Sequence, residues 1–142
     1  MDETLFNDLN QMKQTEEDIL RNIGYSDKAL SMLAKHLNFG EMDNPDITLK
    51  YQSSCSDVLI LYLKYDKERI LDAKYEYIGC IGLEAAASAL TEMIKGKTLQ
   101  DALKINFQDV LSFLEGIPQS KYECIHLALT TLKEGIKIYE NK

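Results

Sequence analysis

The spacing of apolar residues changes along the chain, and its period predicts where helices and strands lie. In the first third, apolar residues recur every three or four positions, which is typical of amphipathic helices. We expect one helix over residues 3–21, ended near Gly24, and a second helix that begins after the N-cap residue Ser26. The apolar positions that define them are Leu5, Phe6, Leu9, Met12, Ile19 and Leu20, followed by Ala29, Leu30, Leu33 and Leu37. Residues 38–46, NFGEMDNPD, are dense in turn formers and predict a loop.

The middle of the chain has the two-residue alternation that is typical of strands. The sequence DVLILYLKYDKERILDAKYEYIG, residues 57–79, predicts two strands joined by a turn at Asp66–Glu68. The first of these strands carries on its two faces Leu59, Leu61 and Leu63, and Val58, Ile60 and Tyr62. A further strand is expected earlier, over residues 47–51.

The remainder of the chain, from Cys80 onward, has the pattern of helices. The expected segments are a helix to residue 95 with a break at Gly96, a short helix capped by Thr98, another near residues 107–113, and a long helix over residues 121–139. Strands followed by helices predict an α+β domain, a small antiparallel three-stranded sheet packed against several helices.

Composition narrows the classes of function. A chain of 142 residues with 45% apolar and 27% charged residues suits one globular domain. Its net charge of -7 disfavours nucleic acid and anionic membranes as partners. No stretch approaches the roughly 18 apolar residues of a spanning helix, and the acidic N-terminal sequence lacks the pattern of a secretory signal. We therefore expect a cytoplasmic protein, in which cysteine thiols stay reduced.

Three widely spaced cysteines suit a ligand set or a reactive group better than a disulfide framework. In SSCSDVL, Cys55 and Asp57 are two residues apart, so an extended backbone would place thiol and carboxylate on one face. The alternative is a loop cysteine beside a solvated aspartate. Cys80 follows Gly79 at a helix start, where backbone N–H groups and the helix dipole favour a thiolate. The alternative here is a buried structural cysteine.

The third cysteine, Cys124, opens the last long helix. Lys121 is close enough along that helix to stabilise a thiolate, and Glu123 either offers an oxygen ligand or faces water. A regular helix points His126 away from Cys124, so His126 and His36 are interpreted as ordinary surface or core histidines. Three thiolates and one carboxylate would complete a four-coordinate site for zinc or part of an iron–sulfur cluster. No P-loop, GxSxG or HExxH motif supports a nucleotide hydrolase, a serine esterase or a zincin.

Three motifs occur in a recognisable order. They are SSCSDVLILYL, then a GC pair followed by small residues and TEMIKGKTLQDAL, then LEGIPQSKYECIHLALTTLKEGI. Together they resemble the IscU/NifU family of iron–sulfur cluster assembly scaffold proteins, from about Tyr25, in YSDKAL, to Ile136. The resemblance implies an IscU/NifU-like scaffold domain over residues 25–142. Residues 1–24 are interpreted as a helical extension that the resemblance does not cover.

The resemblance also implies roles for individual residues. Cys55, Cys80 and Cys124 match the three cluster-binding cysteines, Asp57 matches an aspartate ligand that affects cluster lability, and Lys121 matches a lysine before the last cysteine. The implied protein is a scaffold and not an enzyme. It accepts sulfur from a cysteine desulfurase and iron from a donor, assembles a transient [2Fe–2S] cluster, and passes it to acceptor apo-proteins. Zinc in the same site is also expected when the cluster is absent.

Several positions depart from the family pattern. Ser56 replaces the glycine of CGD, Glu123 replaces a histidine before the last cysteine, and Glu84 adds a negative charge one turn beyond Cys80. The family's LPPVK is IPQSK here, which weakens the case for an Hsp70-type chaperone as a partner. Two alternative functions follow: a zinc-dependent sulfur acceptor similar to SufU sulfurtransferases, and a non-catalytic regulator that binds a cysteine desulfurase.

Overall fold

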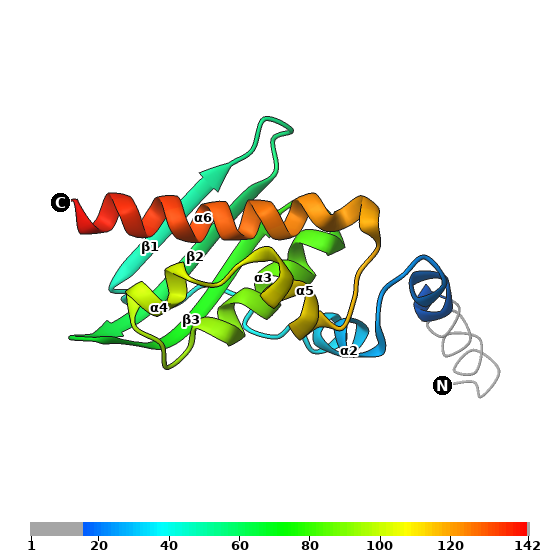
Figure 1. The fold of residues 1–142 in the computed structure, drawn as a ribbon, viewed down its shortest axis with the longest axis horizontal. Coiled ribbons are helices and arrows are strands. Elements are labelled where there is room, and N and C mark those ends of the chain that lie inside the picture. The colour runs from blue at the N-terminus through cyan, green and yellow to red at the C-terminus, as the bar shows by residue number, and fades with distance from the viewer. Residues whose placement is uncertain (1–15, 142) are drawn as a thin grey trace, which may run out of the picture.

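The computed structural model describes residues 16–141 (Figure 1). Its sheet has three antiparallel strands in the order β1-β2-β3, namely β1 (Ile47–Gln52), β2 (Val58–Asp66) and β3 (Arg69–Ile78). Its labelled helices are α2 (Asp27–Lys35), α3 (Ile81–Ile94), α4 (Leu99–Leu103), α5 (Phe107–Leu114) and α6 (Tyr122–Glu140), the last preceded by a 3₁₀ turn at Gln119–Lys121. The α+β architecture predicted from the sequence is confirmed. Within residues 16–141, no helix combines the length and apolar character needed to cross a membrane.

The first helical prediction falls partly outside the described residues. Residues 16–22 are helical, and the earlier part of the predicted segment 3–21 lies beyond what the structure describes. The helix ends before Gly24, whose φ of +122° lies in the left-handed region that glycine tolerates. Ser26 then caps α2 as predicted, because its Oγ accepts a hydrogen bond of 2.9 Å from the backbone N–H of Ala29.

The sheet buries one face, as the alternating pattern of the strands predicts. Leu59, Leu61 and Leu63 of β2 are 0% exposed, and their alternating neighbours on the other face are only partly covered. β2 and β3 meet in the predicted hairpin, where Asp66 pairs with Arg69 across the turn. β1 pairs with the other edge of β2, with Leu49 opposite Leu61.

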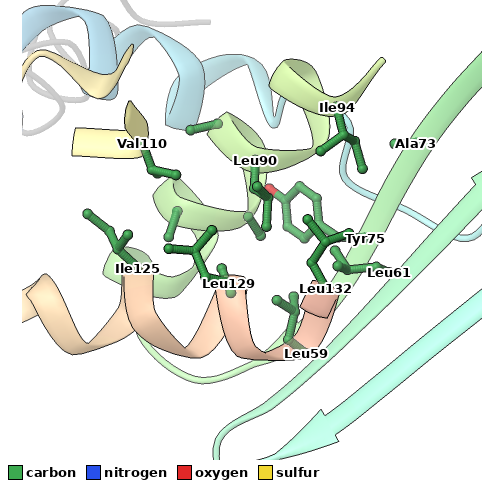
Figure 2. Packing of buried hydrophobic residues seen from close by; sticks show 14 of the residues in the cluster. Leu59, Leu61, Ala73, Tyr75, Leu90, Ile94, Val110, Ile125, Leu129 and Leu132 are labelled. Carbon is green, nitrogen blue, oxygen red and sulfur yellow. The ribbon is translucent and has the colours of Figure 1, made fainter. Parts of the chain in front are cut away.

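Two helices, α3 and α6, supply most of the cover for the buried face. Figure 2 shows Leu90 of α3 and Leu132 of α6 packed beside Leu59 and Tyr75 of the sheet. The run of small residues in α3 is fully buried, which allows the close packing that its composition predicts; it consists of Ala85, Ala86, Ala87, Ser88 and Ala89. α3 begins where β3 ends, and α6 begins beside it, so the starts of both helices lie at one end of the sheet.

A glycine inside α6 sets how closely that helix lies on the sheet. A Cβ atom added at Gly135 would lie 2.7 Å from the Cβ and 2.6 Å from a methyl carbon of Leu49. Those distances are far inside van der Waals contact. Gly135 therefore allows α6 to rest directly on β1, at the end of the helix remote from Cys124.

Candidate thiolate and metal site

One pocket of about 470 Å³ gathers every site residue that the sequence analysis singled out. Its walls come from the β1–β2 turn, the start of α3 and the start of α6. The predicted residues that line it are Cys55, Asp57, Cys80, Lys121, Glu123 and Cys124. Segments that are far apart in the sequence thus converge on a common opening.

Cys80 and Cys124 form the centre of this site. Their Sγ atoms are 3.6 Å apart, although the residues are separated by 44 positions in the chain. Cys80 is the N-cap residue of α3 and Cys124 lies in the first turn of α6. Both thiols are partly buried and neither forms a disulfide. The expectation that two cysteines sit at helix starts is confirmed.

The close approach of these two helix starts depends on Gly82. A Cβ atom at this position would lie 3.2 Å from the Cys124 Sγ and 3.1 Å from the Lys121 Cβ. Such distances are tighter than ordinary side-chain contacts, so any side chain at position 82 would push against the start of α6. Gly82 carries no chemistry of its own, and no motif in the sequence marked it as important.

The environment of Cys80 favours its thiolate. Burial acts to raise the pKa of the Cys80 thiol, but hydrogen bonds from the Leu83 and Gly82 backbone N–H groups and from the Cys124 thiol outweigh it. The positive charge of Lys121 acts in the same direction, and the pKa is lowered overall. These are the effects expected at a helix N-terminus next to a cation.

The pKa of the Cys124 thiol shifts in the opposite direction. Burial raises the pKa of the Cys124 thiol, and its hydrogen bond to Cys80 and the charge on Cys80 raise it further. Lys121 opposes this shift, whereas the carboxylate of Asp57 adds to it. Of the two thiols, Cys80 therefore ionises first as pH rises, and the proton of Cys124 stabilises the thiolate that forms there.

Cys55 and Asp57 lie in a turn, not in an extended segment. The Ser53 Oγ accepts hydrogen bonds from the backbone N–H groups of Cys55 (3.3 Å) and Asp57 (3.2 Å), which closes residues 53–57 into a tight loop. Of the two alternatives for Cys55 and Asp57, the loop is therefore the correct one and the extended segment is not, because the Ser53 side chain accepts from N–H groups that a strand would have paired. Cys55 is exposed, and the Asp57 carboxylate lies against Gly79, where an added Cβ would be 3.2 Å from Oδ1.

The predicted ligand set is only partly assembled in the residues that the structure describes. Across residues 16–141, no three side chains of the His, Cys, Asp and Glu types lie close enough together to hold a metal ion. Cys80 and Cys124 are in contact, whereas Cys55 lines the same pocket from its exposed turn. A third thiolate ligand therefore requires movement of the 53–57 turn toward the pair.

The supporting residues occupy the opening of the pocket. The Lys121 stem lies against Gly82, and its charge lowers the pKa of both nearby thiols. Glu123 is exposed, which fits the interpretation of a solvated carboxylate. His126 is also exposed and stacks on Phe107, with ring centroids 4.7 Å apart. His126 nevertheless lines the pocket, although its position two residues after Cys124 predicted that it would point away from that thiol.

Glu84 points away from the thiols and into a cluster that the sequence analysis missed. Its carboxylate is 5% exposed and lies 2.9 Å from the His36 Nδ1, and it accepts a hydrogen bond of 2.9 Å from the Tyr77 hydroxyl. Burial and the bond to Glu84 raise the pKa of Tyr77 to about 12. The negative charge expected beside Cys80 is thus held by His36, the C-cap residue of α2, which is 48 residues away in sequence, and by Tyr77 of β3.

Comparison with known proteins gives a consistent result. The family model for the NifU-like N-terminal domain matches residues 24–142. The chain is 35% identical over 119 residues to the iron–sulfur cluster assembly scaffold protein IscU 1 of Archaeoglobus fulgidus, covering 83% of this chain and 78% of that protein. It is 36% identical over 137 residues to the iron–sulfur cluster assembly protein IscU of Plasmodium falciparum, covering 94% and 83% respectively.

Solved structures share the fold. An N-terminal NifU-like protein from Brucella abortus matches with a TM-score of 0.63 at 18% identity, covering 83% of this chain and 95% of that one. A protein described as an iron–sulfur cluster assembly scaffold for the SUF system of Fervidobacterium islandicum AW-1 matches with a TM-score of 0.63 at 23% identity, covering 79% and 96%. By the match of the family model over most of its length, this chain belongs to the NifU-like N-terminal domain family.

Proposed function

We propose that this protein is a scaffold on which a transient [2Fe–2S] cluster is assembled and from which it is transferred. The observation that carries the proposal is the Cys80–Cys124 pair, with Sγ atoms 3.6 Å apart, in a pocket also lined by Cys55 and Asp57. Its relatives carry the names of cluster assembly scaffold proteins, which supports the same function.

The chemistry of the residues fits a cargo that must be bound and later released. Thiolates are soft ligands that hold iron and sulfide well, and Cys80 is already disposed toward the thiolate form. The carboxylate of Asp57 is a harder and more labile ligand for the same cargo. Cys55 lies on an exposed turn, so its bond to the cargo forms and breaks without opening the core. We propose Cys55, Asp57, Cys80 and Cys124 as the ligand set.

The proposed partners follow from this chemistry. Sulfur comes from a cysteine desulfurase, iron from a separate donor, and the finished cluster goes to acceptor apo-proteins. The work takes place in the cytoplasm, where thiols remain reduced. The same three thiolates and one carboxylate suit zinc, so zinc competes for the site when sulfide is absent.

The test is anaerobic reconstitution with iron, cysteine and a desulfurase, followed by visible absorption and by analysis of iron and sulfide. We expect a charge-transfer band with equal amounts of iron and sulfide, lost in Cys80→Ser and in Cys124→Ser. Ser120→Ala is the matched control, because Ser120 lines the same pocket without offering a thiol. Thermal melts confirm that each variant remains folded. A full cluster in both cysteine variants would refute the assignment of the pair.

A second candidate function is a zinc-dependent sulfur acceptor. It is favoured by one observation, that two thiols are in contact and Cys80 is the more acidic of the two, while the third cysteine stands apart. If reconstitution gives no cluster but each chain holds one zinc ion, sulfur transfer becomes the better assignment. Transfer of labelled sulfur from the desulfurase to Cys80 then separates an acceptor from a regulator that only binds the desulfurase.

A further inference from the structure

One buried polar group near the site has no role in the ligand set described above. Tyr25 is 2% exposed, and its hydroxyl lacks a hydrogen-bond partner among the described residues, the nearby thiols included. It is the single buried side-chain polar atom in residues 16–141 for which this is true. Buried hydroxyl groups are nearly always paired, so an unpaired one needs an explanation.

The backbone around Tyr25 is fixed on both sides to the segment that leads into α6. A Cβ atom at Gly24 would lie 3.1 Å from the Pro118 Cα, so the chain passes directly against Pro118. On the other side, the Ser26 N–H donates to the Gly116 carbonyl at 3.1 Å. The backbone on both sides of Tyr25 is therefore held against the same segment that leads to Lys121 and Cys124.

The hydroxyl lies within the electrostatic reach of both central thiols. Burial raises the pKa of Tyr25 to about 12, and the charges of Cys80 and Cys124 add to that shift. Tyr75 provides a contrast. It is also fully buried, but its hydroxyl is paired with the Ser88 Oγ at 2.7 Å, and the cysteines do not contribute to the shift of its pKa. Tyr25 thus remains a protonated donor, close to the thiols and lacking an acceptor.

We propose that the Tyr25 hydroxyl donates a hydrogen bond to a negatively charged sulfur atom that is not part of the protein chain and is held at the Cys80–Cys124 pair. This inference rests on the proposed function, since that function brings such a sulfur to the site, either as a cluster sulfide or as the outer sulfur of a persulfide. Tyr25 is a positioning and stabilising donor for the cargo. The ligands alone leave its hydroxyl unpaired, and the arriving sulfur supplies the acceptor.

The test compares Tyr25→Phe with wild type, and uses Tyr75→Phe as the matched loss of a buried hydroxyl. In the metal-free state, Tyr25→Phe should not lower the melting temperature, because no protein hydrogen bond is lost. Tyr75→Phe should lower it, because the buried hydrogen bond between the Tyr75 hydroxyl and the Ser88 Oγ is lost, while Ser88 keeps only its own bond to the Leu37 carbonyl. A clear drop for Tyr25→Phe would show that the hydroxyl already has a protein partner, which would overturn the inference.

The decisive measurement follows reconstitution with ferrous iron and inorganic sulfide. We expect the cluster in Tyr25→Phe to be lost to a chelator about tenfold faster than in wild type, as for removal of one hydrogen bond to a charged acceptor. Resonance Raman bands of the iron–sulfide bonds should shift in heavy water for wild type and not for Tyr25→Phe. Equal lifetimes and equal isotope shifts would overturn the inference while leaving the scaffold function intact, whereas failure of wild type to form a cluster would overturn both.

Two further arms identify the acceptor. With zinc alone no inorganic sulfur is present, so Tyr25→Phe should bind zinc as tightly as wild type. If Tyr25→Phe instead lost about as much affinity for zinc as for the cluster, the hydrogen bond would lie on the thiolates, and the inference would be overturned.

With inorganic polysulfide, a cysteine thiolate attacks one sulfur of the polysulfide chain. A new S–S bond forms as the next S–S bond breaks, and the shortened polysulfide anion leaves. A shorter persulfide lifetime in Tyr25→Phe assigns the acceptor to the persulfide sulfur, and an effect on the cluster alone assigns it to sulfide.

Discussion

Ser56 carries a side chain at a position where the backbone favours glycine. Its φ is +70°, in the left-handed region, and it stands in the turn that holds Cys55 and Asp57. Comparison with the CGD motif indicated that a glycine would have more backbone freedom at this position. The structure shows why that freedom matters, since the positive φ of Ser56 is one that glycine adopts more easily. A side chain in this region costs about 1–2 kcal/mol relative to the usual conformation.

Ser56→Gly should therefore raise the free energy of unfolding by about 0.5–1 kcal/mol, because relief of the strain exceeds the extra chain entropy that glycine loses on folding. Urea denaturation of the metal-free protein measures the change. Ser54→Gly, in the same turn but without a positive φ, is the control and should be neutral or destabilising. A lower stability for Ser56→Gly than for Ser54→Gly would show that the turn is not strained.

The two central thiols should differ in their reactivity with pH. Because the pKa of Cys80 is lowered and that of Cys124 is raised, the Cys80 thiolate forms first as pH rises. Iodoacetamide should therefore modify Cys80 at a lower pH than Cys124, as measured by mass spectrometry of the peptides. In Lys121→Ala the profiles of both thiols should move to higher pH, since the cation lowers both pKa values. Denatured protein, in which the two thiols react alike, is the control.

Individual residues also show what sequence could and could not predict. The cysteines, Asp57 and Lys121 could be found from their motifs, because the chemistry is visible in the residue types themselves. The contact between the Cys80 and Cys124 thiols could not, because it depends on a distance of 3.6 Å that only the fold sets. Glu84 shows the same limit. Its spacing from Cys80 predicts a charge near the thiols, yet contacts with His36 and Tyr77 hold it elsewhere.

At the scale of helices and strands, prediction from the sequence succeeds because the apolar spacing and the capping residues of each segment favour the same secondary structure. β2 alternates cleanly, and Ser26 and Thr98 cap the helices that follow them through side-chain hydrogen bonds. What local patterns do not contain is how closely two elements approach. That information lies at Gly82 and Gly135, where the absence of a side chain matters only because of a neighbour far away in the sequence.

Changing these two glycines to alanine should affect different properties: ligand affinity at Gly82 and folding stability at Gly135. Gly82→Ala presses on Cys124 and Lys121, so zinc and cluster affinity should fall, while stability changes little because the crowding is offset by a gain in helix propensity of about 1 kcal/mol. Gly135→Ala meets the Leu49 side chain at 2.6 Å, so it should destabilise the protein by about 1–3 kcal/mol. Zinc titrations and urea denaturation of both variants measure the two quantities.

In this pair each variant serves as the control for the other. Full zinc affinity in Gly82→Ala would show that the start of α6 yields freely and that the thiol separation is not set by this contact. Unchanged stability in Gly135→Ala would show that β1 and α6 can move apart without loss.

Across the whole molecule, the site joins parts of the chain that local structure leaves separate. The pocket draws on the β1–β2 turn, the start of α3 and the start of α6. A cargo that bridges them binds the folded state and not the unfolded chain, so it shifts the folding equilibrium by mass action. Loading is therefore coupled to the order of all three segments.

Zinc at a free concentration one hundred times its dissociation constant should raise the free energy of unfolding by about 2.7 kcal/mol, which corresponds to about 5–10 °C in Tm for a chain of this size. If Cys55 joins the site as proposed, hydrogen exchange should slow most at residues 53–57, because binding would draw this exposed turn toward the thiol pair. Cys55→Ser is the control and should keep part of the Tm gain but lose the protection of the turn. Protection that remains unchanged in this turn would show that Cys55 does not join the site.

Gly82 has a consequence for how variation in this protein should be interpreted. A larger residue there can be tolerated only if the start of α6 moves, so changes at position 82 and changes around Lys121 and Cys124 are not independent. Substitutions should therefore be acceptable in combinations that fail one at a time. A survey that scores only the ligand residues would call a Gly82 variant intact, although the two thiols had lost their spacing.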